Sequence, residues 1–256
     1  MNLISQPLDF EIEYPEADGK PMSESDQTRD YLIYGVKALR HYFSDRSDVY
    51  VSGNLFIYYR QGVRDAVVSP DVFVIFGVEN KQRRSYKAWE EGGKLPDFVM
   101  EITSKTTQHQ DEEEKLHKYR NLGVTEYFQY DPTGDYLQPP LKGSRLFEGE
   151  YQAIAPTSAI NDSPIFYSNV LGLELHLLEG ELRFFDPQTG EKLLDFDETE
   201  QARQAAEQAR QAAEQARQAA EQARQDAIPR LLGMGLSAEQ VALALGLSTE
   251  EVTNHQ

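Results

Sequence analysis

Residues 97–131 (DFVMEITSKTTQHQDEEEKLHKYRNLGVTEYFQYD) decide the fold, because two kinds of pattern alternate within them. Residues 97–103 are an apolar run with acids at only two positions, which predicts a buried strand. Residues 111–122 begin with acids and end with basic residues before a glycine, an order that favours a helix. Residues 125–131 are rich in aromatic residues and predict another strand. The stretch therefore predicts a strand, a helix and a second strand.

The residues on either side extend this pattern into a domain of mixed class. Residues 24–43 have apolar positions near helical spacing, and residues 48–60 read as a strand with a glycine–asparagine bend. Residues 66–78 are almost continuously apolar and predict a strand buried on both faces. Residues 79–95 are charged and loop-like, and short β-like stretches follow as far as about residue 185. The predicted fold class is α/β (α+β), with a mixed central sheet flanked by helices.

The C-terminal part is a helical extension that begins with a repeat. From Gln201 the heptad Gln-Ala-Arg-Gln-Ala-Ala-Glu occurs three times, to Glu221. These residues are strong helix formers, and a helix about 40 Å long is expected at 1.5 Å per residue. Its alanine seam buries little area per turn, which favours a solvated spacer helix. The alternative is a coiled-coil arm that joins two copies into a homodimer.

The last residues predict two or three short helices. Gly-Leu-Ser occurs at 235–237 and again at 246–248, where the glycine ends one helix and the serine caps the next. The pattern resembles a helix-turn-helix, but residues 248–256 contain no Lys or Arg to contact phosphates, so a small helical module is preferred. The predicted domains are 1–198, the heptad helix at 199–227 and the module at 228–256.

Composition limits the functional classes. The 256 residues carry a formal charge of −18, nearly all of it on residues 1–198, because four Glu and four Arg cancel in residues 199–225. An acidic body argues against nonspecific wrapping of nucleic acid, although a local cleft can differ in sign. The absence of cysteine excludes disulfides and thiol catalysis. No secretory signal and no membrane-spanning run is recognised, so a cytoplasmic protein without membrane contact is expected.

Two acids lie inside otherwise apolar strands. Asp71 follows Pro70 in SPDVFVIFG, and Glu101 lies in FVMEITS. An ionised carboxylate in such a strand costs several kcal/mol unless it is paired or bound to a metal. Two acids from neighbouring strands can hold one hard divalent cation, and a phosphate-bearing substrate suggests Mg²⁺. The neighbouring acid Asp97 is interpreted as a structural residue at the start of its strand.

Lysine residues follow Glu101 at two useful places. Glu101, Thr103 and Lys105 share one strand face, while the following helix returns Asp111 and Lys115 toward the sheet. Lys115 lies one helical turn after Asp111, so the two side chains share a face. A lysine near an activated water can orient the nucleophile or stabilise charge on phosphorus.

These motifs resemble a known family. Pro70-Asp71, the segment Glu101–Thr107, the run Asp111–Lys115 with Tyr119, and the later Gly-Val-Thr-Glu-Tyr at 123–127 resemble the PD-(D/E)XK nuclease superfamily. Within it, the chain is most similar to the large bacterial branch of restriction-endonuclease-like proteins. The resemblance covers roughly residues 24–195.

The resemblance implies an Asp, Glu and Lys site. Asp71 and Glu101 would be the metal-binding acids, and a lysine would be the third catalytic residue. Thr occupies position 103, where the standard motif has Lys, and in this branch the lysine lies in the helix, which points to Lys115. Lys105 is the competing position, and an acid from the first helix (Glu24 or Asp26) could complete the site.

The predicted function is a Mg²⁺-dependent endonuclease that hydrolyses DNA phosphodiester bonds, with Mn²⁺ as a substitute ion. The resemblance implies that cleavage leaves a 5′-phosphate. The alternative is a catalytically degenerate nuclease fold used for binding or assembly through the heptad helix. The acidic charge and Thr103 favour this alternative, whereas the Asp, Glu and Lys trio favours the enzyme.

Overall fold

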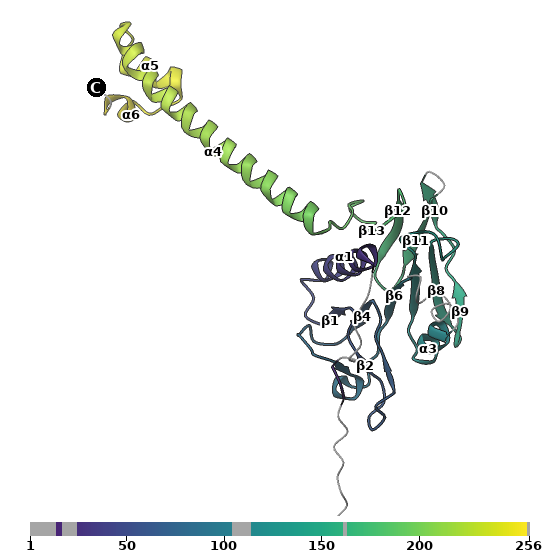
Figure 1. Ribbon diagram of the computed structural model, residues 1–256. Coiled ribbons are helices and arrows are strands. Elements are labelled where there is room, and N and C mark those ends of the chain that lie inside the picture. The colour runs from purple at the N-terminus through teal and green to yellow at the C-terminus, as the bar shows by residue number, and fades with distance from the viewer. Residues whose placement is uncertain (1–13, 17–24, 104–113, 161–162, 255–256) are drawn as a thin grey trace, which may run out of the picture. The chain divides into compact units, whose positions relative to one another are not determined.

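The computed structural model describes residues 14–16, 25–103, 114–160 and 163–254. The chain divides into two compact units, residues 1–196 and 197–256. In the described part of the chain, no helix combines the length and the apolar run that crossing a bilayer requires. The first unit contains three sheets and the second contains helices only (Figure 1).

The main sheet of the first unit has six strands in the order β1-β4-β6-β7-β8-β9. Its strands are β1 (Val49–Ser52), β4 (Val72–Phe76), β6 (Phe98–Ile102), β7 (Glu126–Tyr130), β8 (Leu141–Phe147) and β9 (Glu150–Ala153). β6 and β7 are parallel, and helix α3 (Leu116–Asn121) lies in the connection between them, whereas the other neighbours are antiparallel. This mixed sheet with flanking helices confirms the predicted fold class.

Two smaller sheets complete the unit. The four-stranded sheet contains β10 (Ser158–Ile160), β11 (Ser163–Ser168), β12 (Leu173–Leu178) and β13 (Glu181–Phe185), all antiparallel. The three-stranded sheet contains β2 (Ile57–Tyr58), β3 (Val67–Val68) and β5 (Tyr86–Lys87), followed by the 3₁₀ helix η1 (Ala88–Glu91).

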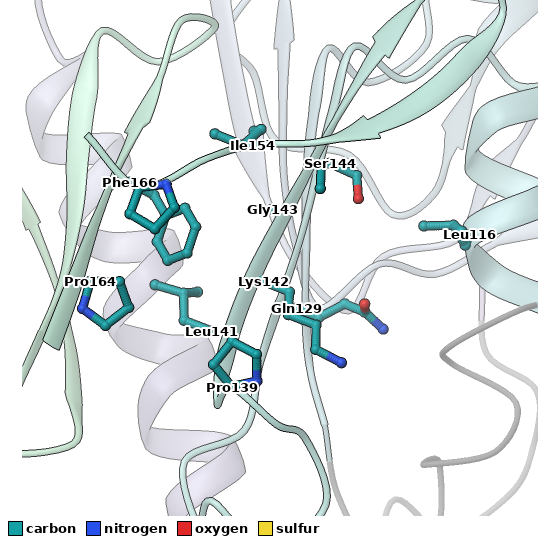
Figure 2. Close-up of a pocket in the computed structure, with 12 residues that line it drawn as sticks. Leu116, Gln129, Pro139, Leu141, Lys142, Gly143, Ser144, Ile154, Pro164 and Phe166 are labelled. Atoms are coloured by element: carbon teal, nitrogen blue, oxygen red, sulfur yellow. The ribbon is translucent and has the colours of Figure 1, made fainter. Parts of the chain in front are cut away.

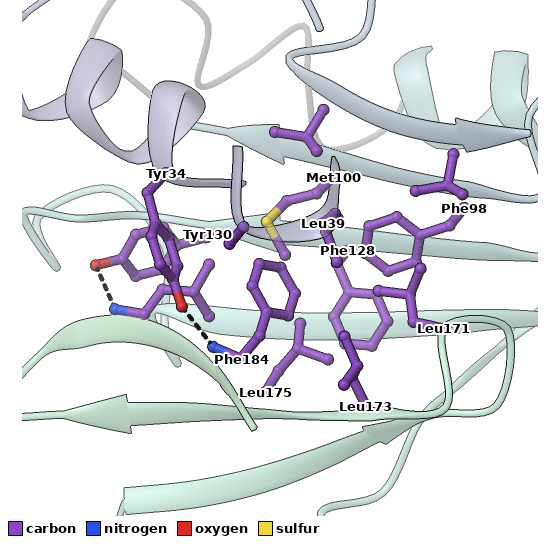
Figure 3. Close-up of a cluster of buried hydrophobic side chains, with 14 of the residues drawn as sticks. Tyr34, Leu39, Phe98, Met100, Phe128, Tyr130, Leu171, Leu173, Leu175 and Phe184 are labelled. Carbon is purple, nitrogen blue, oxygen red and sulfur yellow. Dashed lines mark hydrogen bonds between the residues drawn. The ribbon is translucent and has the colours of Figure 1, made fainter. Parts of the chain in front are cut away.

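The larger core lies between α1 (Asp26–Tyr42), the main sheet and the four-stranded sheet. Figure 3 shows aromatic and aliphatic side chains from all three meeting there, including Phe98, Phe128 and Leu173. Hydroxyl groups tie the layers together, because Tyr34 and Tyr130 accept the N–H groups of β13 residues Phe184 (2.9 Å) and Leu182 (3.3 Å). A second apolar cluster joins the opposite face of the main sheet to α3 and the three-stranded sheet.

Two strand predictions were wrong in their extent. Residues 48–60 form β1 and β2, which belong to different sheets, so the chain changes partners at the predicted bend rather than only bending. Residues 66–78 likewise divide into β3 and β4 around Pro70, whose ring nitrogen cannot donate to a ladder. Residues 79–95, predicted to be a loop, contain β5 and η1.

The second unit consists of α4 (Phe196–Gly233), α5 (Ala238–Leu245) and α6 (Thr249–Thr253). Helix α4 includes all the heptads and continues past Pro229. Ser237 and Ser248 cap α5 and α6 with complete capping boxes, as the sequence predicts. Ile228, Val241, Ala242 and Val252 form a small core among these helices.

Candidate active site

Asp71 and Glu101 are brought together by the pairing of β4 with β6. Val72 is registered with Met100, so Asp71, which immediately precedes β4, lies opposite Glu101. One carboxylate oxygen of Asp71, Oδ2, accepts the N–H of Ile102 at 2.7 Å and so closes the end of this ladder. Glu101 lies within β6, all of whose residues are buried, and its own exposure is 1%.

The two carboxyl groups lie on one face of the sheet, because residues opposite each other on paired strands project to the same side. Burial raises the pKa of Asp71 well above its ordinary value, and the charge of Glu101 raises it further. The Ile102 N–H and the nearby Lys115 ammonium oppose this rise only in part. Two acids held this close favour sharing a proton or binding a cation.

The chain just before Asp71 is fixed by a close approach of the backbone. A Cβ atom on Gly53 would lie 2.1 Å from the carbonyl oxygen of Asp71, so only glycine fits this position. The next residue, Asn54, donates its N–H to the carbonyl of Pro70 at 2.9 Å. The point where the chain leaves the main sheet after β1 therefore also positions one of the two acids.

Helix α3 supplies two donors to Glu101. The ammonium group of Lys115, the residue before the helix, lies 2.9 Å from Glu101 Oε2. The hydroxyl of Tyr119 donates to Glu101 Oε1 at 2.5 Å. Burial, followed by the Glu101 charge, raises the pKa of Tyr119 well above its ordinary value, so this hydroxyl stays protonated and remains a donor. Each oxygen of Glu101 thus has its own donor.

Sequence reasoning assigned no role to Tyr119, although the signal was present. Lys115 and Tyr119 are four residues apart, a spacing that places both side chains on one helical face. The helix can then contact a single carboxylate with both groups. Lys118 points elsewhere, since its ammonium group donates to the carbonyl of Val67 at 2.9 Å and holds α3 against β3.

Thr103 adds a third oxygen on the same side. Its N–H donates to the backbone carbonyl of Tyr130 at 2.7 Å and continues the β6–β7 ladder, so the alternation of side chains places Thr103 on the face of Glu101. Its hydroxyl is buried, and among the described residues it has no hydrogen-bond partner. Two carboxylates and an unsatisfied hydroxyl are an oxygen donor set of the kind that hard divalent cations prefer. No group of three or more His, Cys, Asp or Glu suited to a metal occurs in the described ranges.

The other predicted positions lie apart from this site or outside the described residues. Lys105, Asp111 and Glu24 fall outside the described ranges. Asp26 is exposed and pairs with Arg29 at 2.7 Å, so it does not join the acids. Asp97 has a structural role, because its Oδ2 accepts the N–H of Phe76 at 2.8 Å. Asp71 and Asp97 thus close the two ends of the β4–β6 ladder in the same way.

Another buried acid on the sheet, Glu126, has structural partners of its own. It pairs with Arg145 at 2.8 Å, and it accepts the hydroxyl of Ser168 at 2.5 Å and the N–H of Asn169 at 3.0 Å. These contacts join the main sheet to the four-stranded sheet. Lys115 therefore pairs with Glu101 and not with Glu126.

Comparison with known protein families assigns this chain to one of them. Residues 7–163 match the Uma2 family, whose description is "Putative restriction endonuclease". The match covers more than half of the chain. The protein belongs to the Uma2 family. This confirms the resemblance to restriction-endonuclease-like proteins, and Asp71, Glu101, Lys115 and Tyr119 of this Uma2 protein all lie within the matched residues.

A solved structure described as a "putative nuclease belonging to DUF820", from Anabaena variabilis, is similar over 58% of this chain and 83% of its own, with 14% identity and a TM-score of 0.40. No curated protein sequence matches the Uma2 protein.

Proposed function

We propose that this Uma2 protein is a Mg²⁺-dependent endonuclease that hydrolyses phosphodiester bonds of DNA. The observation that carries the proposal is the register that places Asp71 opposite Glu101 on one face of the sheet, with the Lys115 ammonium 2.9 Å from the second acid. The family description supports DNA as the substrate, because restriction endonucleases cleave DNA. Mn²⁺ is expected to substitute for Mg²⁺, since both prefer oxygen ligands.

In this proposal Asp71 and Glu101 hold the cation. When bound, such a cation polarises a phosphoryl oxygen and makes a water molecule more acidic. Asp71 must lose its proton for this, and its raised pKa means that cation binding and proton release are linked. Tyr119 keeps the Glu101 carboxylate in one orientation through its hydrogen bond.

Lys115 is the proposed catalytic cation of the protein itself. Its ammonium group donates to Glu101 Oε2 at 2.9 Å, which places a positive charge next to the acids. A charge at this position can stabilise the negative charge that develops on the phosphoryl group. Thr103 occupies the position where the standard motif has a lysine, so the strand supplies no ammonium group there. The ammonium group near the acids comes instead from Lys115, just before α3.

Nicking of supercoiled plasmid in Mg²⁺ tests the proposed function. Asp71→Asn is expected to abolish nicking, because the amide removes one of the two charges that attract the cation. Asp97→Asn is the matched control: this acid also follows a proline and also accepts one N–H from the partner strand, but it lies at the other end of the ladder. The control should nick like the wild type. Equal nicking by all three proteins would indicate a contaminant and defeat the proposal.

Tyr119→Phe is expected to weaken Mn²⁺ binding by roughly 10–100-fold, the usual effect of losing a hydrogen bond to a metal ligand. Removing the hydroxyl leaves Glu101 Oε1 without the donor that orients it. Calorimetric titration with Mn²⁺ measures the change. Tyr151→Phe is the control, because its hydroxyl bonds to the carbonyl of Val124 at 2.9 Å in the same apolar cluster, away from the acids. Equal affinities for the wild type and Tyr119→Phe would rule out this orienting role.

A further inference from the structure

A row of polar residues crosses the main sheet from the two acids. Glu101 on β6 is registered with Gln129 on β7, and Gln129 is registered with Lys142 on β8. Registered residues on neighbouring strands project to the same face of a sheet. Asp71, just before β4, lies opposite Glu101, so the row consists of Asp71 followed by Glu101, Gln129 and Lys142 on three successive strands. Lys142 lies two strand spacings from Glu101, about 10 Å.

The row ends at a cavity of about 610 Å³. Consecutive residues 141–144 of β8 all line it, so the cavity follows the edge of this strand rather than one face. The pairing of β8 with β9 ends beside the cavity, where Gly143 accepts the N–H of Ile154 at 2.8 Å and residues 141–142 are not registered with β9. Figure 2 shows Gln129 and Lys142 next to each other on one side of β8, with Leu141 and the Phe166 ring on the other.

The lining combines flat apolar groups with two polar ones. Pro139, Pro164 and the largely buried Phe166 line it with ring atoms, and Gln129 and Lys142 supply an amide and an ammonium group. Bases stack on aromatic rings, and a glutamine amide can both donate to and accept from a base edge. A lysine contributes a phosphate contact, which is independent of sequence. The volume is within the range of pockets that take small molecules.

We propose that this cavity accepts an unpaired nucleobase of the substrate strand, near the phosphate that is cleaved. Gln129 contacts the base edge and Lys142 contacts the backbone between the base and the acids. The inference rests on the proposed nuclease function and names where its substrate lies. A β-strand edge can instead pair with an extended peptide, but the polar row that joins this cavity to the acids favours a nucleotide.

Binding of two fluorescein-labelled 12-mers tests this inference in Ca²⁺, with the full-length protein and anisotropy as the readout. One is single-stranded DNA, and the other has the same backbone with abasic residues throughout. Wild-type protein is expected to bind the base-containing strand roughly tenfold more tightly, since stacking of one base has about this effect. Ala153→Phe and Ser144→Phe, which fill the cavity from β9 and β8, should remove most of this preference.

Gln152→Phe is the matched control, because Gln152 is exposed, neighbours Ala153 on β9 and does not line the cavity. It should keep the wild-type preference. Lys142→Met should weaken binding of both strands by the same factor, because a phosphate contact does not depend on the base. Equal thermal unfolding of the variants and the wild type excludes loss of fold as the cause.

Two results would overturn the inference: equal binding of the two strands by the wild type, as a peptide-binding groove would give, or an unchanged preference in both filled variants. Plasmid nicking is a separate readout of the proposed hydrolysis. Wild-type protein that prefers bases through this cavity but does not nick DNA would support the cavity assignment and reject the nuclease function.

Discussion

Lys115→Met is expected to lower the rate of plasmid nicking in Mg²⁺ by about 10²–10³-fold, the usual cost of losing one preorganised donor to a developing charge. Methionine preserves most of the length and the apolar stem of lysine but has no ammonium group. The side chain of Lys115 is one-third exposed, at 32%, so the change should leave the fold intact. Single-turnover nicking measures the rate without interference from product release.

Lys118→Met is the control for this change. Both lysines belong to the same short helical segment, but the ammonium group of Lys118 bonds to the carbonyl of Val67 and not to an acid. Its loss should lower stability slightly and leave the rate within about threefold of the wild type. A rate for Lys115→Met equal to that of Lys118→Met would show that Lys115 is not the catalytic lysine and would direct attention to Lys105.

Two aspartates should respond to neutralisation in opposite ways. Asp71→Asn is expected to raise the free energy of unfolding at neutral pH by about 1–2 kcal/mol, because the surroundings of Asp71 oppose its ionisation and the amide carries no charge. The carbonyl of the substituted amide can still accept the Ile102 N–H, and its NH₂ group can donate to Glu101. If so, the Asp71 carboxylate that the proposed chemistry needs lowers the stability of the fold, as is common at functional sites.

Asp131→Asn should instead lower the free energy of unfolding by about 2–4 kcal/mol. Although burial opposes its ionisation, hydrogen bonds lower the pKa of Asp131 below its ordinary value. Each oxygen accepts two donors: Oδ1 accepts the N–H and hydroxyl of Thr133, and Oδ2 accepts the N–H groups of Tyr136 (2.6 Å) and Leu137 (2.9 Å). In Asp131→Asn the amide nitrogen replaces one of these oxygens, and because it is itself a donor it leaves the pair of donors at that position without an acceptor.

The pH dependence of the stability of the two variants follows from the directions in which the pKa values of Asp71 and Asp131 are shifted. The raised pKa of Asp71 means that, as pH rises above the unfolded value of about 3.9, the unfolded chain releases its proton first and the wild type loses stability relative to Asp71→Asn. The lowered pKa of Asp131 stabilises the wild type above the same value, and this contribution disappears as pH falls through the folded pKa.

Urea unfolding at pH 7 and at pH 4 measures both differences. The gain of Asp71→Asn and the loss of Asp131→Asn should both shrink at the lower pH. A destabilised Asp71→Asn at pH 7 would mean that its carboxylate is well compensated and would remove the argument that this acid needs a cation.

The sequence predicts β6, α3 and β7 because each has a local signal. β6 is an apolar run, α3 is followed closely by Gly123 with φ +75°, and β7 is dense in aromatic residues. The caps at Ser237 and Ser248 are equally local. The division of residues 48–60 between two sheets has no such signal, since β2 has two residues and its ladder depends on β3 and β5, which are distant in sequence.

The candidate site shows the same limit. Asp71 and Glu101 are recognisable because charge is rare inside apolar strands, and the resemblance selects Lys115 from the lysines of the helix. That Tyr119 reaches the second oxygen of Glu101 depends on how α3 packs against β6. The row that leads through Gln129 to Lys142 depends on the register of three strands. Strand register is set by tertiary packing rather than by local sequence, and a shift of one residue in the pairing would move each side chain to the opposite face of the sheet.

The most direct test of the central claim is the anomalous density of crystals soaked in Mn²⁺. If the two acids hold a divalent cation, wild-type crystals will show a peak between the carboxylates of Asp71 and Glu101, and Asp71→Asn crystals will show none there. Wild-type protein that nicks plasmid but binds manganese only elsewhere would contradict the assignment of these acids as the metal site.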